Sequence, residues 1–400
     1  MAESFGDMLR EYRAAAGFSM GQLAKRIHYS KGYLSKIENG LKPPHETVAR
    51  LCDSVLNAGG MLVEAARTAR DRIAGEHKLD RRQVLAAGTV FGITLAGGPR
   101  PIPHEGVVAG IRTTFEHLRR LGMQTSPVVI LESLVAQANT VCALAHENPE
   151  PIRSRLLLLA ARIAEYTGWM SQEVGDEQRA LWWTRRSSEL AQAGGDRQIT
   201  SYALVREAGL ALYRQDPITT IDLAQRAQVS GSGSLRVLAL AARREAQGHA
   251  LAGDRDSYQR AMDRAAELLD SSTPDDRAYP ELGTSAPDPV ELARGWALCD
   301  LGKPDDAAAI LERELARLPA VSRRTRARFG VRRSLAYVLS GEVDQSCLTL
   351  TETLDDVAHV DSATVRMDLR ELARHLGRWH NHGVVREVFP DLRRALSQRA

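Results

Sequence analysis

The stretch SMGQLAKRIHYSKGYLSKIENG, residues 19–40, has the spacing of two short helices joined by a tight turn. Ala24 is the small residue at which two such helices can cross. Leu34 and Ile37 follow as apolar anchors on the inner face of the second helix. Anchoring through these residues leaves the outer face of the second helix free for contact with base edges and phosphates. The spacing therefore predicts a helix-turn-helix unit whose second helix spans about 30–39.

Helical patterns on both sides of this stretch predict a small all-α domain of five helices. The preceding apolar residues recur at the spacing of one helix face: Phe5, Met8, Leu9, Tyr12 and Ala16. Ser19 and Ser30 are the expected N-caps of the two helices in the stretch. A fourth helix is expected at about 46–56, after Pro43-Pro44, with these residues inside: Val48, Leu51, Cys52 and Val55. A fifth follows Gly59-Gly60.

Positive charge gathers in the same part of the chain. The whole protein has a formal net charge of only +3. Four of its six lysines nevertheless lie within the first 42 residues: Lys25, Lys31, Lys36 and Lys42. Together with Arg26 they outnumber the single acid of this segment, Glu38. A local excess of positive charge suits a polyanion such as DNA, although Lys31 and Lys36 taken alone would also fit a solvated helix face.

Residues 5–60 resemble the phage-repressor-type, xenobiotic-response-element (XRE) family of helix-turn-helix domains, through the motif QLAKRI…S…YLSKIENG…P. The resemblance implies that the helix at 30–39 enters the major groove of operator DNA and that the preceding helix approaches phosphate. With the basic residues of the stretch included, the expected DNA contacts are Met20, Gln22, Lys25, Ser30, Lys31, Gly32, Ser35, Lys36 and Lys42.

The same resemblance implies a structural ion pair between Arg13 and Glu38, which ties the first helix to the end of the recognition helix. Replacement of Glu38 is then expected to cost stability, because it leaves Arg13 without its partner, and not to change sequence preference. His28 stands at the turn position that the family usually fills with glycine. The turn is therefore expected to differ from the family's, since a non-glycine residue adopts positive φ only at some cost.

Composition divides the chain into a helix-turn-helix domain at 1–75, a linker at 76–104 and a helical domain at 105–400. The linker carries the apolar run VLAAGTVFGITLAGG, residues 84–98, after Arg81-Arg82. Its apolar core at 84–96 falls short of the ~20 residues that span a bilayer. It predicts a buried or interface helix, with a peripheral membrane contact as the alternative and no stable membrane insertion. No apolar signal segment opens the chain, so a cytoplasmic, nucleoid-associated location is expected.

From residue 105 onward, amphipathic helices recur with a period near 40 residues. The turns between paired helices are expected near Gly175-Asp176, Gln215-Asp216, Gly253-Asp254, Gly302-Lys303-Pro304, Gly341-Glu342 and His382-Gly383. A fixed period of this length is typical of an α-solenoid. The units resemble tetratricopeptide repeats, although they are longer than the usual repeat of about 34 residues.

The segment VSRRTRARFGVRRSLAYVL, residues 321–339, is rich in arginine and contains no acid. Arg324, Arg328 and Arg332 recur every four residues and form one helical stripe. This stripe either binds a carboxylate or phosphate ligand in the solenoid groove or pairs with acids of a neighbouring helix.

Metal, cofactor and enzyme chemistry have little support in the sequence. The cluster His375, His380 and His382 is irregularly spaced, and the four cysteines form no CxxC pair. No metal or cofactor is expected. The motifs GxxxxGK[ST], GxSxG and HExxH do not occur, so the protein is not expected to be an enzyme.

These observations together predict an all-α regulator that binds double-stranded operator DNA as a homodimer. Its solenoid is expected to dimerise and to sense a peptide, a small molecule or a protein. The layout resembles peptide-pheromone-receptor regulators, and the arginine content resembles that of regulators from high-GC actinobacteria. The alternative is a DNA-tethered scaffold that recruits a protein partner through its helical repeats.

Overall fold

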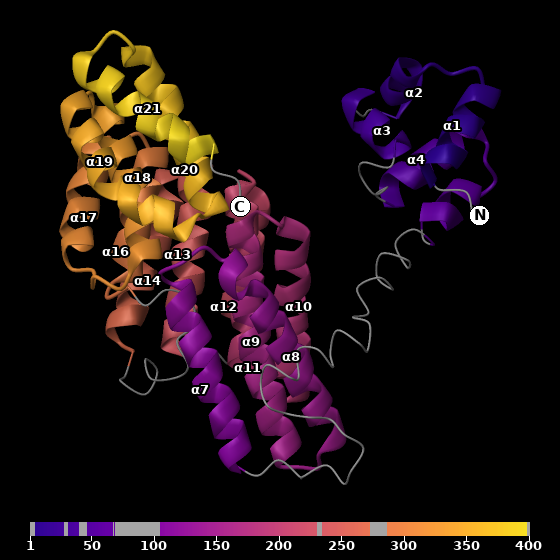
Figure 1. Cartoon of the computed structure of the whole chain (residues 1–400), viewed down its shortest axis with the longest axis horizontal. Coiled ribbons are helices and arrows are strands. Elements are labelled where there is room, and N and C mark those ends of the chain that lie inside the picture. The colour runs from indigo at the N-terminus through magenta and orange to yellow at the C-terminus, as the bar shows by residue number, and fades with distance from the viewer. Residues whose placement is uncertain are drawn as a thin grey trace. The chain divides into compact units, whose positions relative to one another are not determined.

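The computed structural model describes residues 5–27, 31–39, 46–66, 68, 105–229, 234–272 and 286–397. The chain divides into two compact units, residues 1–98 and 99–400. Every regular element in these described ranges is a helix (Figure 1). The predicted all-α class is therefore confirmed.

The first unit is a set of short helices around a small core. Its helices are α1 (Phe5–Ala15), α2 (Met20–Arg26), α3 (Lys31–Glu38) and α4 (Glu46–Leu56), and residues 61–66 are helical as well. Leu9, Leu23 and Leu34 are fully buried in its centre. Two expected core positions differ: Ala16 lies beyond the end of α1 and is exposed, and Leu51 is 37% exposed. The inward-facing apolar set of α1 and that of α4 therefore each contain one residue fewer than the apolar pattern predicts.

The second unit is built from longer helices. They are α7 (Glu105–Gly122), α8 (Val128–Glu147), α9 (Ile152–Val174), α10 (Glu177–Ala193), α11 (Arg197–Tyr213), α12 (Pro217–Val229), α13 (Leu235–Leu251), α14 (Arg255–Asp270), α16 (Pro289–Asp300), α17 (Pro304–Ala316), α18 (Arg323–Ser340), α19 (Val343–Val360), α20 (Ala363–Leu376) and α21 (Gly383–Ser397). A short 3₁₀ turn, Gly377–Trp379, follows α20.

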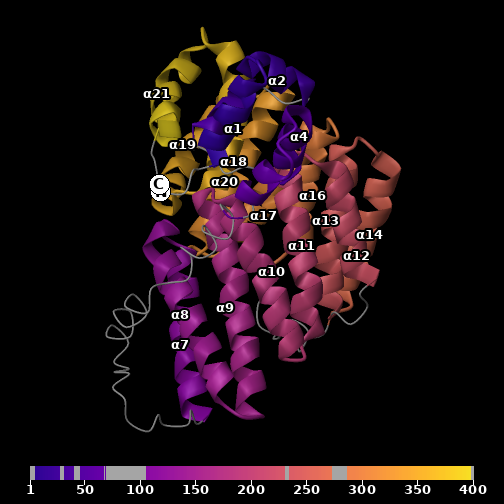
Figure 2. The same cartoon turned by 90° about the vertical axis from the view of Figure 1, so that its right-hand side faces the viewer.

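Consecutive helices of this unit pack as antiparallel pairs that repeat along the chain (Figure 2). All six predicted turns fall between the two helices of a pair: α9 and α10, α11 and α12, α13 and α14, α16 and α17, α18 and α19, α20 and α21. Several turns share one capping device. Asp176 accepts a hydrogen bond from the Arg179 backbone N–H, and Asp254 accepts one from the Ser257 backbone N–H. An aspartate directly after the turn thus starts the second helix of the pair.

Small residues let the paired helices approach closely. Gly330 of α18 faces Thr353 of α19 so closely that a Cβ at Gly330 would lie 2.5 Å from the Thr353 Oγ1. In α16, Ala293 and Ala297 are buried beside Trp296, as the sequence pattern predicted. Close approach of this kind repeats from pair to pair and makes the unit a stack.

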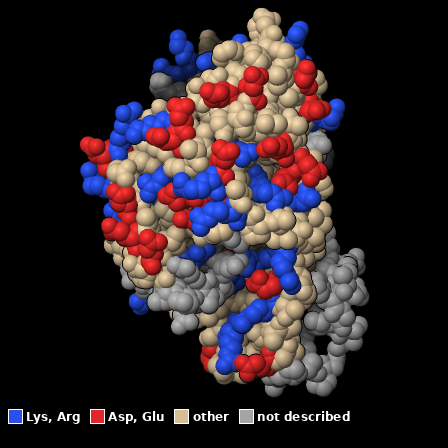
Figure 3. All heavy atoms as spheres, turned by 90° about the vertical axis from the view of Figure 1, so that its left-hand side faces the viewer, with Lys and Arg blue, Asp and Glu red and all other residues tan. Residues whose placement is uncertain are grey.

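One described helix, α8, is long and apolar enough by length and composition to cross a membrane. Core helices of soluble proteins pass the same test, and Ile130, Leu134 and Ala138 of α8 are fully buried in the core shared with α9. The apolar run at 84–96 lies outside the described residues. On the surface, Figure 3 shows basic and acidic side chains interspersed over one face. Arg313 and Glu291 form one of the ion pairs of the helical unit.

Candidate functional site

The helix-turn-helix begins with a capping box at α2. The Ser19 Oγ accepts a hydrogen bond from the Gln22 backbone N–H at 3.3 Å, and the Ser19 backbone N–H donates to the Gln22 Oε1 at 2.8 Å. This reciprocal pair satisfies two backbone donors that would otherwise lack partners at the helix start. The predicted cap at Ser19 is confirmed, and Gln22 contributes one of its side-chain atoms to it.

The inner face of α3 is held by the expected anchors and by a close contact with α1. Leu34 and Ile37 of α3 are 0% and 1% exposed, and Ala24 of α2, the helix that packs against α3, is buried. A Cβ at Gly6 would lie only 2.4 Å from the Glu38 carbonyl oxygen. Glycine at this position therefore lets α1 pack directly against the last turn of α3.

Glu38 at the end of α3 is a buried carboxylate bound by two arginines of α1. Arg13 holds both of its oxygens, with Nη2 2.7 Å from Oε1 and Nε 2.8 Å from Oε2. Arg10 adds a longer contact from Nε to Oε1 at 3.4 Å and also donates to the Glu38 carbonyl oxygen. The ion pair that the resemblance implied is present, and Arg10 is a second partner that the sequence analysis did not identify.

Arg13 also fixes the start of the next segment. Its Nη1 donates to the Phe18 carbonyl oxygen at 3.0 Å, just before the cap of α2. The hydrogen bond to Glu38 raises the pKa of Arg13 above its ordinary value, and this outweighs the opposite effect of partial burial. The guanidinium therefore stays charged and joins α1, α2 and α3 around one carboxylate.

The expected DNA contacts differ in how the structure places them. Lys25 is exposed in the last turn of α2, beside the equally exposed Arg26. Met20 is partly buried and packs against the core of the unit. Ser35 is half-buried on α3, and its Oγ accepts a hydrogen bond from the Asn39 side chain at 3.3 Å.

The remaining expected contacts are only partly described. Lys31, Gly32 and Lys36 lie on α3, which places them on the helix that follows the turn, but their side chains lie outside the described residues. Ser30 and Lys42 lie outside the described residues altogether, as does the turn residue His28.

The arginine stripe of α18 is not an open ligand face. Arg324 is 1% exposed, and its side chain is surrounded by protein acceptors. It donates from Nε to the Gly122 carbonyl oxygen, from Nη2 to the Thr125 carbonyl oxygen and from Nη1 to Glu173. Arg324 thereby binds the loop between α7 and α8 to the start of α18, and each of its three guanidinium nitrogens donates to a protein acceptor.

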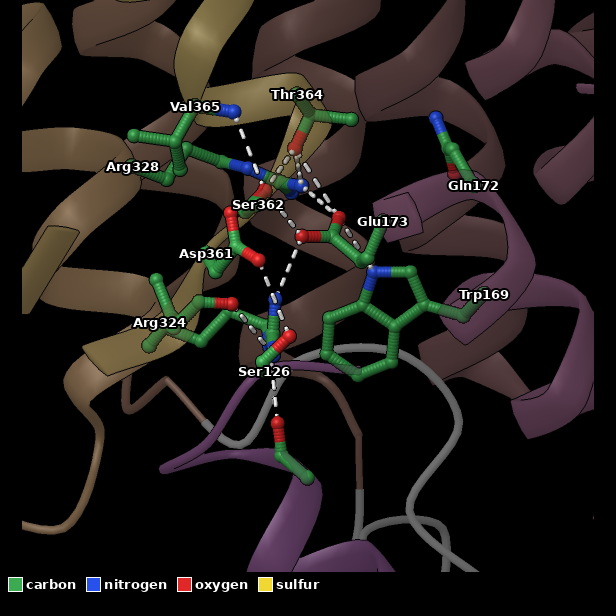
Figure 4. A network of polar contacts seen from close by, with 12 residues as sticks. Ser126, Trp169, Gln172, Glu173, Arg324, Arg328, Asp361, Ser362, Thr364 and Val365 are labelled. Atoms are coloured by element: carbon green, nitrogen blue, oxygen red, sulfur yellow. Dashed lines mark hydrogen bonds and ion pairs between the residues drawn. The ribbon is translucent and has the colours of Figure 1, made fainter. Parts of the chain in front are cut away.

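Glu173 at the end of α9 is the centre of this network (Figure 4). Its carboxylate is completely buried and accepts five hydrogen bonds, at 2.5–3.2 Å, from Trp169, Arg324, Arg328, Ser362 and Thr364. Burial alone would raise the pKa of Glu173. The charges of Arg328 and Arg324 and the hydrogen bond from Ser362 outweigh it, so the pKa falls to about 2. One carboxylate thus links α9 with α18 and α20.

The other two arginines of the stripe have different roles. Arg332 donates from Nε and Nη2 to Asp368 of α20, at 3.1 and 2.5 Å, and its guanidinium carbon lies 3.2 Å from the centre of the Trp296 ring. Arg328 reaches Glu173 with Nη2, while its buried Nε has no acceptor. All three arginines of the stripe pair with acids of neighbouring helices, which is one of the two alternatives that the sequence left open. Arg328 differs from the other two in that its Nε is buried and has no acceptor among the described residues.

Metal-ligating side chains do not gather in the described part of the chain. No group of three or more histidine, cysteine, aspartate or glutamate side chains there is placed to hold a metal ion. His375 instead contacts Glu371 at 3.2 Å, four residues earlier on α20.

A helix-turn-helix domain family model matches residues 4–66, which include α1 to α4. No curated protein matches the chain. The first unit is therefore a helix-turn-helix DNA-binding domain. The match covers the first unit only, so the function of the helical unit is argued from its own residues.

Proposed function

We propose that the protein is a sequence-specific transcriptional regulator of the XRE type that binds operator DNA as a homodimer and changes its DNA binding in response to a signal sensed by the helical unit. The observation that carries this proposal is the arrangement of α2 and α3. Ala24 of α2 and Leu34 and Ile37 of α3 are buried and anchor the two helices from inside. Lys25 and Arg26, at the end of α2, are exposed. Such an arrangement leaves one face of α3 available for a DNA groove.

The division of roles on α3 supports DNA reading by its other residues. Glu38, the one acid of the basic segment, is neutralised by Arg13 and lies 6% exposed. It therefore does not oppose the phosphate backbone. Lys31 and Lys36 lie on α3, and Lys25 is exposed one helix earlier. A lysine that contacts phosphate contributes to affinity on every sequence, whereas a contact to a base edge contributes to preference.

The test is operator binding by the full chain and by the Lys31→Ala/Lys36→Ala variant, measured by genome-wide footprinting and then by fluorescence anisotropy on the sites found. The variant is expected to bind at least about tenfold more weakly, because removal of a side chain that contacts a base or a phosphate costs about 1–3 kcal/mol. The dependence of affinity on salt should also become shallower, by about one charge for each phosphate that a lysine no longer neutralises.

Lys303→Ala is the matched control, because Lys303 is an exposed lysine of the helical unit. It removes the same kind of charge and should leave footprints and affinity unchanged. Unchanged footprints for the Lys31→Ala/Lys36→Ala variant would show that α3 is not the reading helix. Footprints of two half-sites about 34 Å apart are expected for a dimer, whereas single half-sites with a stoichiometric protein partner would favour the scaffold alternative.

A further inference from the structure

A cavity lies at the centre of the helical unit, where the first helices of successive pairs face one another. Its lining comes from α9, α11, α13, α16 and α18. The contacts of Glu173 with α18 and α20 close the unit on one side of it. The cavity has a volume of about 80 Å³. That exceeds the roughly 10–15 Å³ that one ordered water needs, so a small anionic group fits where an extended peptide does not.

The charge of the lining is unusual for a protein interior. Five arginines line the cavity: Arg206, Arg243, Arg244, Arg324 and Arg328. Within the described residues, two carboxylates contact them, Glu165 and Glu173. Arg324 is fully buried, and the other four side chains are partly buried. Cations that are withdrawn from water are ordinarily paired with acids, because an unpaired charge is costly there. The cavity therefore carries an excess of positive charge that the described residues do not neutralise.

Arg243 and Arg244 of α13 carry most of this excess. Arg243 donates to the Pro289 carbonyl oxygen, and Arg244 donates to the Gln247 side chain. Both partners are neutral, and neither arginine has a carboxylate partner among the described residues. Burial lowers the pKa of Arg243 to about 10 and that of Arg244 to about 9, and neighbouring arginines add to the effect. Both side chains remain charged at neutral pH and gain from an added anion.

Several hydrogen-bond donors around the cavity are also unused. The Nε atoms of Arg206, Arg243, Arg244 and Arg328 are buried and have no acceptor. Arg206 gives only its Nη2 to a neutral acceptor, Gln172, at 2.9 Å, and its Nε lies 3.9 Å from Glu165. Buried donors without acceptors are rare in folded proteins and are expensive. These four arginines come from three helices to line one cavity, and an anion that offers several oxygens would supply acceptors there.

We propose that this cavity binds the phosphate group of a small phosphorylated molecule through Arg206, Arg243, Arg244 and Arg328. A phosphate monoester carries close to two negative charges and three strong acceptor oxygens, which matches several guanidinium groups better than one carboxylate does. Arg324 takes no part, because each of its guanidinium nitrogens already donates to a protein acceptor. That this molecule is the signal of the regulator rests on the proposed function, whereas the site itself does not.

The test is isothermal titration calorimetry on the full chain without DNA, with inorganic phosphate, glycerol 3-phosphate and citrate as separate probes at equal ionic strength. The two phosphates are expected to bind with one site per chain. The Arg243→Gln/Arg244→Gln variant should bind at least about tenfold more weakly, because charge-assisted hydrogen bonds are removed. Arg260→Gln is the matched control: Arg260 is an exposed arginine on the outer helix α14, so binding should be unchanged.

Absence of phosphate binding to the unaltered chain overturns the proposal. Equal phosphate binding by the unaltered chain, the Arg243→Gln/Arg244→Gln variant and the Arg260→Gln control also overturns it. Binding of citrate in place of the phosphates overturns the assignment to phosphate. Hydrogen–deuterium exchange of the unaltered chain gives an answer that does not depend on the variant's folding. Phosphate should protect α11, α13 and α18, and protection elsewhere rejects the site. Neither measurement involves DNA, so failure here is distinct from failure of operator binding in the Lys31→Ala/Lys36→Ala variant.

Discussion

At the scale of single residues, Glu38 shows how one acid within a basic helix becomes part of the scaffold. Its carboxylate turns inward and is bound by Arg13 at both oxygens, and Arg10 reaches the same end of α3. The motif resemblance already implied the Arg13 partner. It did not imply the close contact of Gly6 with the Glu38 carbonyl oxygen, since that contact depends on the crossing angle between α1 and α3.

Glu38→Gln is expected to destabilise the first unit by about 1.5–3 kcal/mol, the usual range for removal of a hydrogen bond to a charged group. Arg13 would keep its charge but lose its counterion. Urea denaturation of the full chain, followed by a probe in the first unit, measures the change. Glu11→Gln is the control, because Glu11 is an exposed acid of α1 and its replacement should change stability by no more than about 0.5 kcal/mol. A variant with full stability and altered operator preference would show that Glu38 reads DNA after all.

At the scale of elements, the helix pair is the unit that the sequence predicts well. The turns at Gly175-Asp176 and Gly253-Asp254 were located because glycine accepts the left-handed backbone and aspartate caps the next helix. Both are local effects. The distance between paired helices is not a local effect, because it depends on which side chains meet across the pair, as Gly330 and Thr353 do.

Gly330→Ala is expected to destabilise the second unit by about 1–3 kcal/mol. The new Cβ would lie 2.5 Å from the Thr353 Oγ1, which is itself held by a bond to the Thr349 carbonyl oxygen at 2.7 Å. Denaturation of the full chain, followed by a probe in α18, measures the destabilisation.

The double variant Gly330→Ala/Thr353→Ala is the decisive control for that clash. Removal of the threonine side chain makes room for the new methyl group. The combined effect should therefore be smaller than the sum of the two single effects by at least about 0.5 kcal/mol. Strict additivity would mean that α18 and α19 do not approach as closely as described.

At the scale of the whole helical unit, Glu173 joins segments that are far apart in sequence. It ends α9, yet its partners Arg324 and Arg328 begin α18, and Ser362 and Thr364 lie at the start of α20. Five hydrogen-bond donors around the buried Glu173 carboxylate keep it ionised. The carboxylate in turn offsets the free-energy cost of burying these donors. The network therefore couples the two ends of the repeat stack.

Glu173→Gln is expected to destabilise the chain at pH 7 by about 3 kcal/mol or more, because the buried Arg324 and the partly buried Arg328 lose their counterion. The pKa of Glu173 is about 2 in the folded chain and 4.5 ordinarily, so its contribution is complete above about pH 5 and is lost as pH falls toward 2. The difference between the unaltered chain and the variant should therefore narrow by roughly 1.4 kcal/mol per pH unit below about pH 4.

Urea denaturation midpoints from pH 7 to pH 3 measure this narrowing. Glu189→Gln serves as the control, because the Glu189 side chain is 65% exposed and pairs with Arg186, three residues away on the same helix. It should change stability little at any pH. A constant difference between Glu173→Gln and the unaltered chain down to pH 3 would mean that Glu173 does not carry the lowered pKa.

The sequence by itself determined the features that arise within a few residues of the chain. The helices, the turns between pairs, the cap at Ser19 and the anchors Leu34 and Ile37 all follow from local spacing and capping. Only the tertiary structure decided which charged groups meet. The sequence left open whether Arg324 and Arg332 bind a ligand or pair with acids, and the structure shows that Glu173 and Asp368 from other helices bind them.

The sequence analysis did not identify Arg243 and Arg244, which lie in the segment AARREAQ, residues 241–247. Their position among buried alanines was the one local signal that they face inward. The physical reason for the difference is range. Backbone geometry and capping act between neighbours in sequence, whereas burial, ion pairing and the charge of a cavity depend on contacts among segments as much as about 200 residues apart.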